Sequence, residues 1–148
     1  MNSRTKKISR ITRLMEQQKE AMEMKVLQTR HRLETEERHL FNLKNDLLKT
    51  LDNFEKKVQE GDRVSLQDVV FLFGLHNFLA SGIERKQKEV SLIGKELEVL
   101  KQFLLEAYQK KEIFGVFKNK MIQQEMRETV TMEQKALDFL NLKIGSAQ

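Results

Sequence analysis

Apolar residues recur along the first 60 residues at steps of three and four. This spacing is typical of a helix that presents one face to one neighbouring helix, and it predicts a helix over about residues 3–59. Gln18, Thr29 and Glu36 stand where the repeat would place apolar residues, so the middle of this face is weakly specified. The apolar positions are Ile8, Ile11, Met15, Met22, Val26, Leu33, Leu40, Leu43, Leu47, Leu51, Phe54 and Val58.

A second helix is predicted over about residues 66–142, followed by a short tail. Ser65 with Asp68 three residues later is a capping-box-like start, in which each side chain can satisfy a free backbone N–H. The run from Val69 to Leu79 is so apolar that a strand is the competing interpretation. We reject the strand because helical spacing continues unbroken beyond this run. It continues through Ile83, Val90, Ile93, Leu97, Leu100, Leu104, Ala107 and Phe114.

Residues 60–65, with Gly61 among them, are the one stretch that reads as a turn. One reversal between two one-faced helices predicts an all-α fold, an antiparallel two-helix coiled-coil hairpin forming a single domain over residues 1–148. A fold near residue 62 would place Phe54 opposite Phe71, Leu43 near Arg85 and Lys86, and Ile8 opposite Phe117. The second helix is longer than the first, so we expect everything after about Met121 to overhang.

Composition agrees with long helices and a thin core. The chain has 148 residues with no proline, which would interrupt a helix at a cost of about 3 kcal/mol. It has no cysteine, so disulfides and thiolate metal ligands are excluded. No stretch reaches the roughly 20 apolar residues of a bilayer span, and we expect a soluble, cytoplasmic protein without direct membrane insertion.

The net charge of +5 is concentrated at one end. Residues 1–15 carry five bases and no acid, and the remaining bases equal the acids in number. This stretch is either a solvated basic terminus or a docking end for an acidic partner surface. Its apolar residues, Ile8, Ile11 and Leu14, form only a short face, which argues against binding to a membrane surface. The five bases are Arg4, Lys6, Lys7, Arg10 and Arg13.

Residue spacings of catalytic or metal chemistry are not found. His31, His39 and His76 do not stand three or four apart, as a metal pair on a helix would. The glycines are dispersed, with no phosphate-binding loop, and the basic terminus lacks the aromatic residues of a single-strand reader. We therefore expect no enzyme activity, no catalytic residue, no cofactor, no metal and no nucleic-acid partner.

The stretch 69–80 has more apolar residues than a two-helix interface needs. Leu72, Phe73 or Phe78 must therefore face outwards and make this side adhesive. The alternative is a bulkier local core in which Leu51 and Phe54 pack over two faces of the second helix.

Three stretches carry a resemblance to a known family. They are the run Glu133-Gln134-Lys135-Ala136-Leu137-Asp138, the spacing Leu75-x-x-x-Leu79-x-x-x-Ile83-x-x-x-Gln87, and the spacing Leu104-x-x-Ala107-x-x-x-Lys111-Glu112. With the layout of the whole chain, they resemble the FliJ family of coiled-coil proteins of flagellar type III export. Injectisome stalk proteins of the YscO type share this layout.

The resemblance implies a non-catalytic stalk, similar to the γ subunit of rotary ATPases, that acts in flagellum biogenesis and motility. Its partners would be a hexameric export ATPase, which it binds and promotes, the cytoplasmic domain of a membrane export-gate protein, and export chaperones. It would be cytoplasmic and peripherally associated with the inner-membrane export apparatus.

The resemblance also implies site residues. The end that holds both termini would enter the ATPase ring. Members of the family tend to have alanine and histidine where this chain has Gly82 and Lys86. The expected ATPase-binding residues are Arg4, Lys6, Lys7, Ile8, Arg10, Ile11, Arg13 and Met121, and the expected gate-binding residues are Leu75, Leu79, Gly82 and Lys86.

A second hypothesis needs no resemblance. The apolar side chains of the overhang and of residues 69–80 could pair copies of this chain into a structural coiled coil, whereas a stalk is expected to be monomeric. The overhang residues concerned are Met121, Met126, Met132, Phe139 and Leu142.

Overall fold

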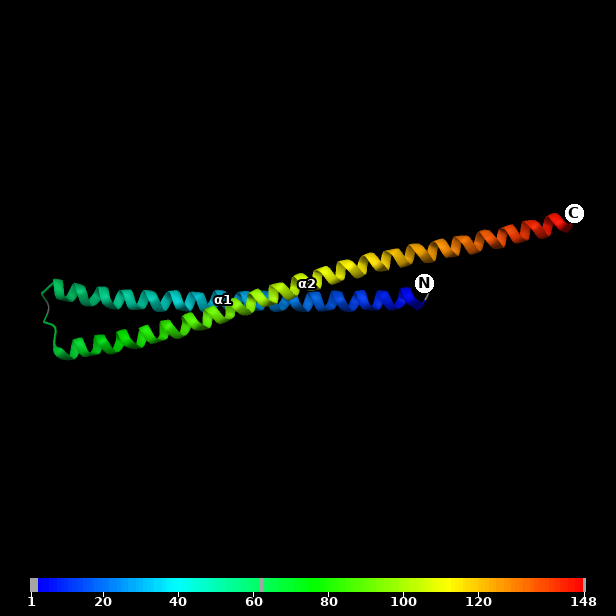
Figure 1. The fold of residues 1–148 in the computed structure, drawn as a ribbon. Helices are drawn as coiled ribbons and strands as arrows, with labels where there is room; N and C mark the ends of the chain where they lie inside the picture. Colours follow the sequence, from blue (N-terminus) through cyan, green and yellow to red (C-terminus); the bar gives the residue numbers. More distant parts are fainter. Residues whose placement is uncertain (1–2, 62, 148) are drawn as a thin grey trace. The chain divides into compact units, whose positions relative to one another are not determined.

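The protein consists of two long α-helices. A computed structural model describes residues 3–61 and 63–147, with α1 spanning Ser3–Gln59 and α2 spanning Leu66–Ala147. Figure 1 traces the two helices and the short connection between them. In the part of the chain described here there is no strand, and the helices pack together. The all-α hairpin predicted from the heptad pattern is confirmed.

The connection between the helices is built on Gly61. The N–H of Glu60 donates to the carbonyl oxygen of Lys56 at 2.9 Å, and the N–H of Gly61 donates to that of Val58 at 3.2 Å. Gly61 has a φ of 75°, a left-handed conformation that costs glycine little because it has no Cβ. Asp62, at the centre of the predicted turn, lies outside the described residues.

Helix α2 begins with the capping box that the sequence predicts. The N–H of Ser65 donates to Oδ2 of Asp68 at 3.0 Å, and the N–H of Asp68 donates to Oγ of Ser65 at 3.1 Å. The hydrogen bonds from Ser65 hold the pKa of Asp68 below its ordinary value. At the other end, α2 runs to Ala147, whereas the sequence pattern predicts a helix to about residue 142 and then a short tail.

The chain forms two compact units. One comprises Met24–Gln102, and the other comprises Met1–Glu23 together with Phe103–Gln148. We call them the turn unit and the terminal unit.

The turn unit contains the best-buried apolar side chains among the described residues. These belong to Val26 of α1 and to Leu79, Ile93 and Leu97 of α2, and Ile93 is only 1% exposed. Thr29, which interrupts the apolar pattern of α1, is buried beside this row at 8% exposure. The core is thus one side chain thick, as expected for two helices that meet along a single seam.

The terminal unit is held together by polar contacts as well as apolar ones. Thr5 of α1 is fully buried, and its Oγ1 donates to Oε1 of Glu125 on α2 at 2.5 Å. Phe114 and Phe117, three residues apart on α2, lie with their ring centroids 6.3 Å apart and their planes tilted by 55°. No apolar side chain in the described part of this unit is as buried as the core of the turn unit.

The last stretch of α2 is the overhang that the sequence predicts. Every residue from Met126 to Gly145 is exposed. Exposed fractions of the large apolar side chains here run from 51% at Leu140 to 73% at Leu142. This segment therefore has no described partner to cover its apolar side chains.

One segment of α2, Leu66–Gly145, includes an 18-residue window with a mean hydropathy of 1.3, long and apolar enough to cross a membrane by length and composition. The apolar pattern of the sequence predicts no such stretch. Only 6% of that window is buried, because a two-helix interface covers one side of a helix. A single helix of this kind is weak evidence for a membrane span.

Candidate interaction surfaces

The five basic residues predicted to dock a partner lie on α1 in the terminal unit. All five are exposed, and among the described residues none of them takes part in an ion pair. Their charges therefore face solvent without local neutralisation. The residues are Arg4, Lys6, Lys7, Arg10 and Arg13.

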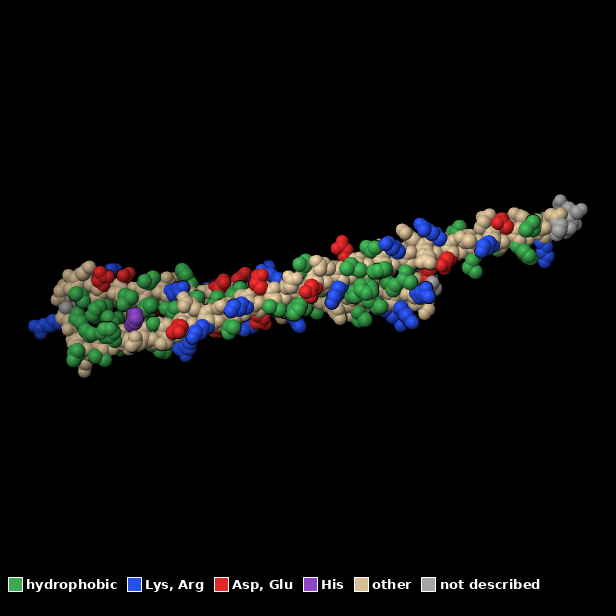
Figure 2. All heavy atoms as spheres, viewed as in Figure 1, with side chains coloured by type: hydrophobic (Ala, Val, Ile, Leu, Met, Phe, Trp, Pro, Cys, Tyr) green, Lys and Arg blue, Asp and Glu red, His purple; other side chains and the backbone are tan. Residues whose placement is uncertain are grey.

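Helix α2 adds two cations to this surface that sequence reasoning missed. Lys118 is half-buried and Lys120 is exposed, and neither is in an ion pair among the described residues. The pairing of Thr5 with Glu125 brings this part of α2 beside the start of α1. Figure 2 shows Lys and Arg side chains gathered beside hydrophobic ones where these segments meet. We call the seven residues Arg4, Lys6, Lys7, Arg10, Arg13, Lys118 and Lys120 the basic surface.

The three apolar residues assigned to the same docking end lie close to the helix contact. Ile8 and Met121 are half-buried, whereas Ile11 is 39% exposed. Met121 lines a shallow hollow together with Arg4 and Gln124. The structure thus brings the predicted ATPase-binding residues of both helices together in one unit.

The four residues predicted to bind the export gate lie against α1. Leu79 is 8% exposed, Leu75 is half-buried, and a Cβ at Gly82 would lie 3.9 Å from Cδ1 of Leu43. Leu43 therefore lies at Gly82, about one helical turn from the predicted neighbours Arg85 and Lys86.

Lys86 is engaged within the hairpin. Its Nζ lies 2.5 Å from Oε2 of Glu36 and 3.2 Å from Oε2 of Glu89. The hydrogen bond between Lys86 and Glu36 raises the pKa of Lys86 and lowers the pKa of Glu36. Glu36, which interrupts the apolar pattern, is thus accommodated by a partner from the facing helix.

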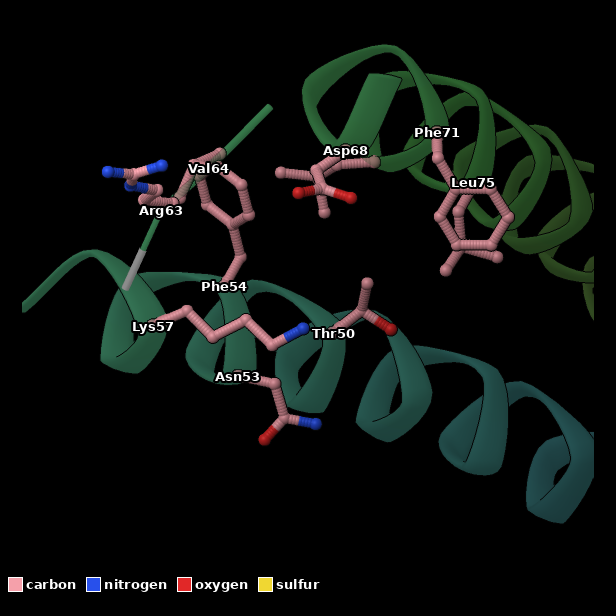
Figure 3. A pocket seen from close by; sticks show the side chains of 10 residues that line it. Thr50, Asn53, Phe54, Lys57, Arg63, Val64, Asp68, Phe71 and Leu75 are labelled. Atoms are coloured by element: carbon pink, nitrogen blue, oxygen red, sulfur yellow. The ribbon is translucent and has the colours of Figure 1, made fainter. Parts of the chain in front are cut away.

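Next to these residues, an open cavity of about 630 Å³ lies between the helices and their connection. Figure 3 shows Phe54 of α1 directed toward Val64, and Phe71 and Leu75 of α2 directed toward α1. Phe71 remains 72% exposed although it lines this cavity together with Phe54. Both Phe73 and Phe78 are also more than 60% exposed, so the stretch 69–80 does present apolar side chains outwards.

A polar layer crosses the helix contact in the terminal unit. Nζ of Lys19 lies 3.1 Å from Glu16 and 3.7 Å from Glu23, and it sits 5.0 Å from the ring centroid of Tyr108. The hydroxyl of Tyr108 donates to Glu23 at 2.5 Å, and Lys111 pairs with Glu16. Hydrogen bonds from Lys111 and Lys19 lower the pKa of Glu16. The hydrogen bond that the Tyr108 hydroxyl donates to Glu23 raises the pKa of Tyr108.

Within the described ranges, no three His, Cys, Asp or Glu side chains are grouped as metal ligands would be. Among the described residues, three ion pairs join the two helices, Arg32 with Glu96, Glu36 with Lys86 and Glu16 with Lys111, and further ion pairs lie within one helix. The two surfaces above are the candidate sites of interaction.

Comparison with protein families decides the class of the molecule. The family model described as "Flagellar FliJ protein" matches residues 5–143. The chain belongs to the FliJ family. No curated protein and no solved structure matches it significantly. The FliJ match spans both units and agrees with the resemblance carried by residues 75–87, 104–112 and 133–138.

Membership in the FliJ family implies a role in flagellar protein export. The family is structural and non-catalytic, and it belongs to the cytoplasmic part of the export apparatus. Its helical coiled-coil character is that of the fold described above.

Proposed function

We propose that this protein is the stalk of a flagellar type III export apparatus. It binds and promotes the hexameric export ATPase through the terminal unit, and it links the ATPase to the membrane export gate and to export chaperones. The observation that carries the proposal is the basic surface, whose seven cations have no ion pair among the described residues. Beyond this surface, α2 continues as a single helix. The match to a flagellar family favours this system over an injectisome.

The mechanism needs no chemistry from the stalk itself. A two-helix contact inside a six-fold ring touches the six subunits unequally, so the stalk can favour different states in different subunits. The cations of the basic surface would pair with acidic side chains of the ring, and the exposed apolar side chains of the overhang would pack inside it.

Charge reversal tests the ATPase assignment. The five cations Arg4, Lys6, Lys7, Arg10 and Arg13 are changed to glutamate, and stimulation of the purified export ATPase is measured. We expect stimulation to be lost, because five attractive charges become repulsive.

The matched control reverses five exposed cations of α1 in the turn unit, and it should stimulate like the wild type. Stimulation by the reversed variant that equals the wild type would overturn the assignment. The control positions are Lys25, Arg30, Arg38, Lys44 and Lys49.

Gate binding is proposed for the stretch of α2 that includes Leu75, Leu79, Gly82 and Lys86. Because Leu79 and Lys86 contribute to the helix contact, replacing them would weaken the hairpin as well as any gate contact. The exposed neighbours Phe71 and Phe78 are cleaner probes. Phe71→Ala with Phe78→Ala should weaken binding to the cytoplasmic gate domain and leave ATPase stimulation unchanged; equal loss of both activities would argue for general unfolding.

Self-association is the second candidate function, and the exposed apolar side chains of residues 126–144 favour it. The mass of the protein by light scattering over a dilution series separates the two candidates. A stalk remains a monomer throughout, whereas a structural coiled coil forms dimers or larger species that dissociate on dilution.

A further inference from the structure

The terminal unit has one face on which cations and exposed apolar side chains are combined. Along α1, Arg4, Lys7 and Ile11 follow at steps of three and four, so they lie on one stripe. Along α2, a second stripe of the same spacing runs through Ile113, Phe117, Lys120 and Gln124.

Both stripes lie on the same side of the helix pair. Arg4 of the first stripe and Gln124 of the second line one hollow, whose other lining residues are Ser3, Thr5, Met121, Glu125 and Glu128. We call Arg4, Lys7, Ile11, Ile113, Phe117 and Lys120 the mixed face.

The apolar side chains of the mixed face are open to solvent. Ile11 is 39% exposed, and Ile113 and Phe117 are each 54% exposed. The sequence alone offers only the short apolar face of α1 at this end. Packing of α2 beside α1 adds an aromatic and a β-branched side chain to it, together with one more cation.

The electrostatics of the mixed face favour an anionic partner. Arg4, Lys7 and Lys120 have no ion pair among the described residues. The nearby acid Glu125 accepts a hydrogen bond from Thr5, and Glu128 accepts one from Gln124 at 3.4 Å. Basic residues clustered beside apolar and aromatic side chains on a helical surface are the pattern that adsorbs to anionic lipid.

We propose that the mixed face binds the surface of an anionic lipid bilayer, without inserting a helix into it. Phe117, Ile11 and Ile113 lie at the level of the headgroups, and the three cations pair with lipid phosphates. This inference goes beyond the stalk function and does not rest on it. One consequence does rest on the proposed function: lipid and the ATPase would then compete for the terminal unit.

Vesicle co-sedimentation of the full chain tests the proposal. The probes are phosphatidylcholine vesicles with and without phosphatidylglycerol. We expect binding only to the anionic vesicles, and release as salt rises from about 0.1 M to about 1 M, where the Debye length falls from about 10 Å to about 3 Å.

Two variants separate charge from apolar contact. Lys7→Glu with Lys120→Glu should weaken binding to anionic vesicles at least about tenfold, and Ile11→Ser with Phe117→Ser should weaken it without changing its salt dependence. The control Lys44→Glu with Lys49→Glu changes the same charge in the turn unit and should bind like the wild type. Helicity by circular dichroism is checked for each protein.

Three outcomes would overturn the proposal. They are equal binding to neutral vesicles, equal loss in the control variant, and a wild-type protein that stimulates the ATPase but ignores anionic vesicles. The last result would mean that the mixed face recognises acidic protein surface only, and it would leave the stalk function intact.

Discussion

Individual residues fix the register of the two helices, and polar side chains that pair across the interface specify it most strictly. Glu36 of α1, which interrupts the apolar pattern, pairs with Lys86 of α2, and Glu16 of α1 pairs with Lys111 of α2. Polar side chains that meet only in one alignment specify register at some cost in stability. The two layers are the parts of the seam that a one-turn slip would break.

Acid should weaken these layers. The pKa values of Glu16 and Glu36 are lowered from 4.5 by hydrogen bonds from lysines. Their contribution is therefore present above about pH 4.5 and lost as the pH falls through the lowered values. We expect the melting temperature to drop below that pH, and Glu16→Gln with Glu36→Gln to flatten this dependence. Glu133→Gln, in the exposed overhang, should leave the profile unchanged; a flattened profile in that control would refute the assignment.

Truncation of Ile93 should strongly lower the stability of the hairpin. It is 1% exposed in a core one side chain thick, so Ile93→Ala should lower the free energy of unfolding by about 2 to 5 kcal/mol. Leu137→Ala, at a position 54% exposed, should change it little. Denaturation in urea measures both, and equal costs would contradict the described seam.

The two helices and the turn between them follow from local features that can be recognised in the sequence. The absence of proline, the steps of three and four, Gly61 and the Ser65–Asp68 box suffice to predict two helices and the turn between them. The exact facing of residues could not be predicted, because a shift of about one turn keeps apolar side chains opposite one another. In the structure Leu43 lies beside Gly82, about one turn before the expected neighbours Arg85 and Lys86.

The capping box of α2 can be tested alone. Ser65→Ala removes the hydroxyl that accepts the N–H of Asp68, and it should cost about 1 kcal/mol. Thermal unfolding followed by circular dichroism checks this. Ser65→Asp, which can still accept that hydrogen bond, should retain most of the stability, and a loss equal to that of alanine would rule out capping as the cause.

The overhang of α2 should contribute nothing to the stability of the rest of the protein. Residues 126–145 are exposed throughout, so this helical segment lacks the tertiary packing that supplies most helix stability in proteins. We expect a chain ending after residue 125 to keep the melting temperature of the full chain. We also expect fast amide hydrogen exchange in this segment of the intact protein. Strong protection there would show a partner, such as a second copy.

At the scale of the molecule, the sequence predicts which kinds of surface exist but not which residues complete them. The charge excess of residues 1–15 is visible in the sequence. Lys118 and Lys120 could not be assigned to the same surface, since their neighbourhood depends on pairing across more than one hundred residues of sequence. Likewise, the gate stripe chosen by resemblance contains side chains that the helix contact itself uses, Leu79 and Lys86.

The terminal unit, and not the turn, is the part of the molecule that we propose meets the export ATPase. The chain has no cysteine, so a single cysteine introduced at an exposed position can carry a photoreactive crosslinker without interference. Lys7→Cys and Lys120→Cys probe the basic surface, and Phe71→Cys and Phe78→Cys probe the apolar side chains near the turn. With the hexameric ATPase, crosslinks are predicted from positions 7 and 120 and not from 71 or 78. Crosslinks from 71 and 78 alone would contradict the account.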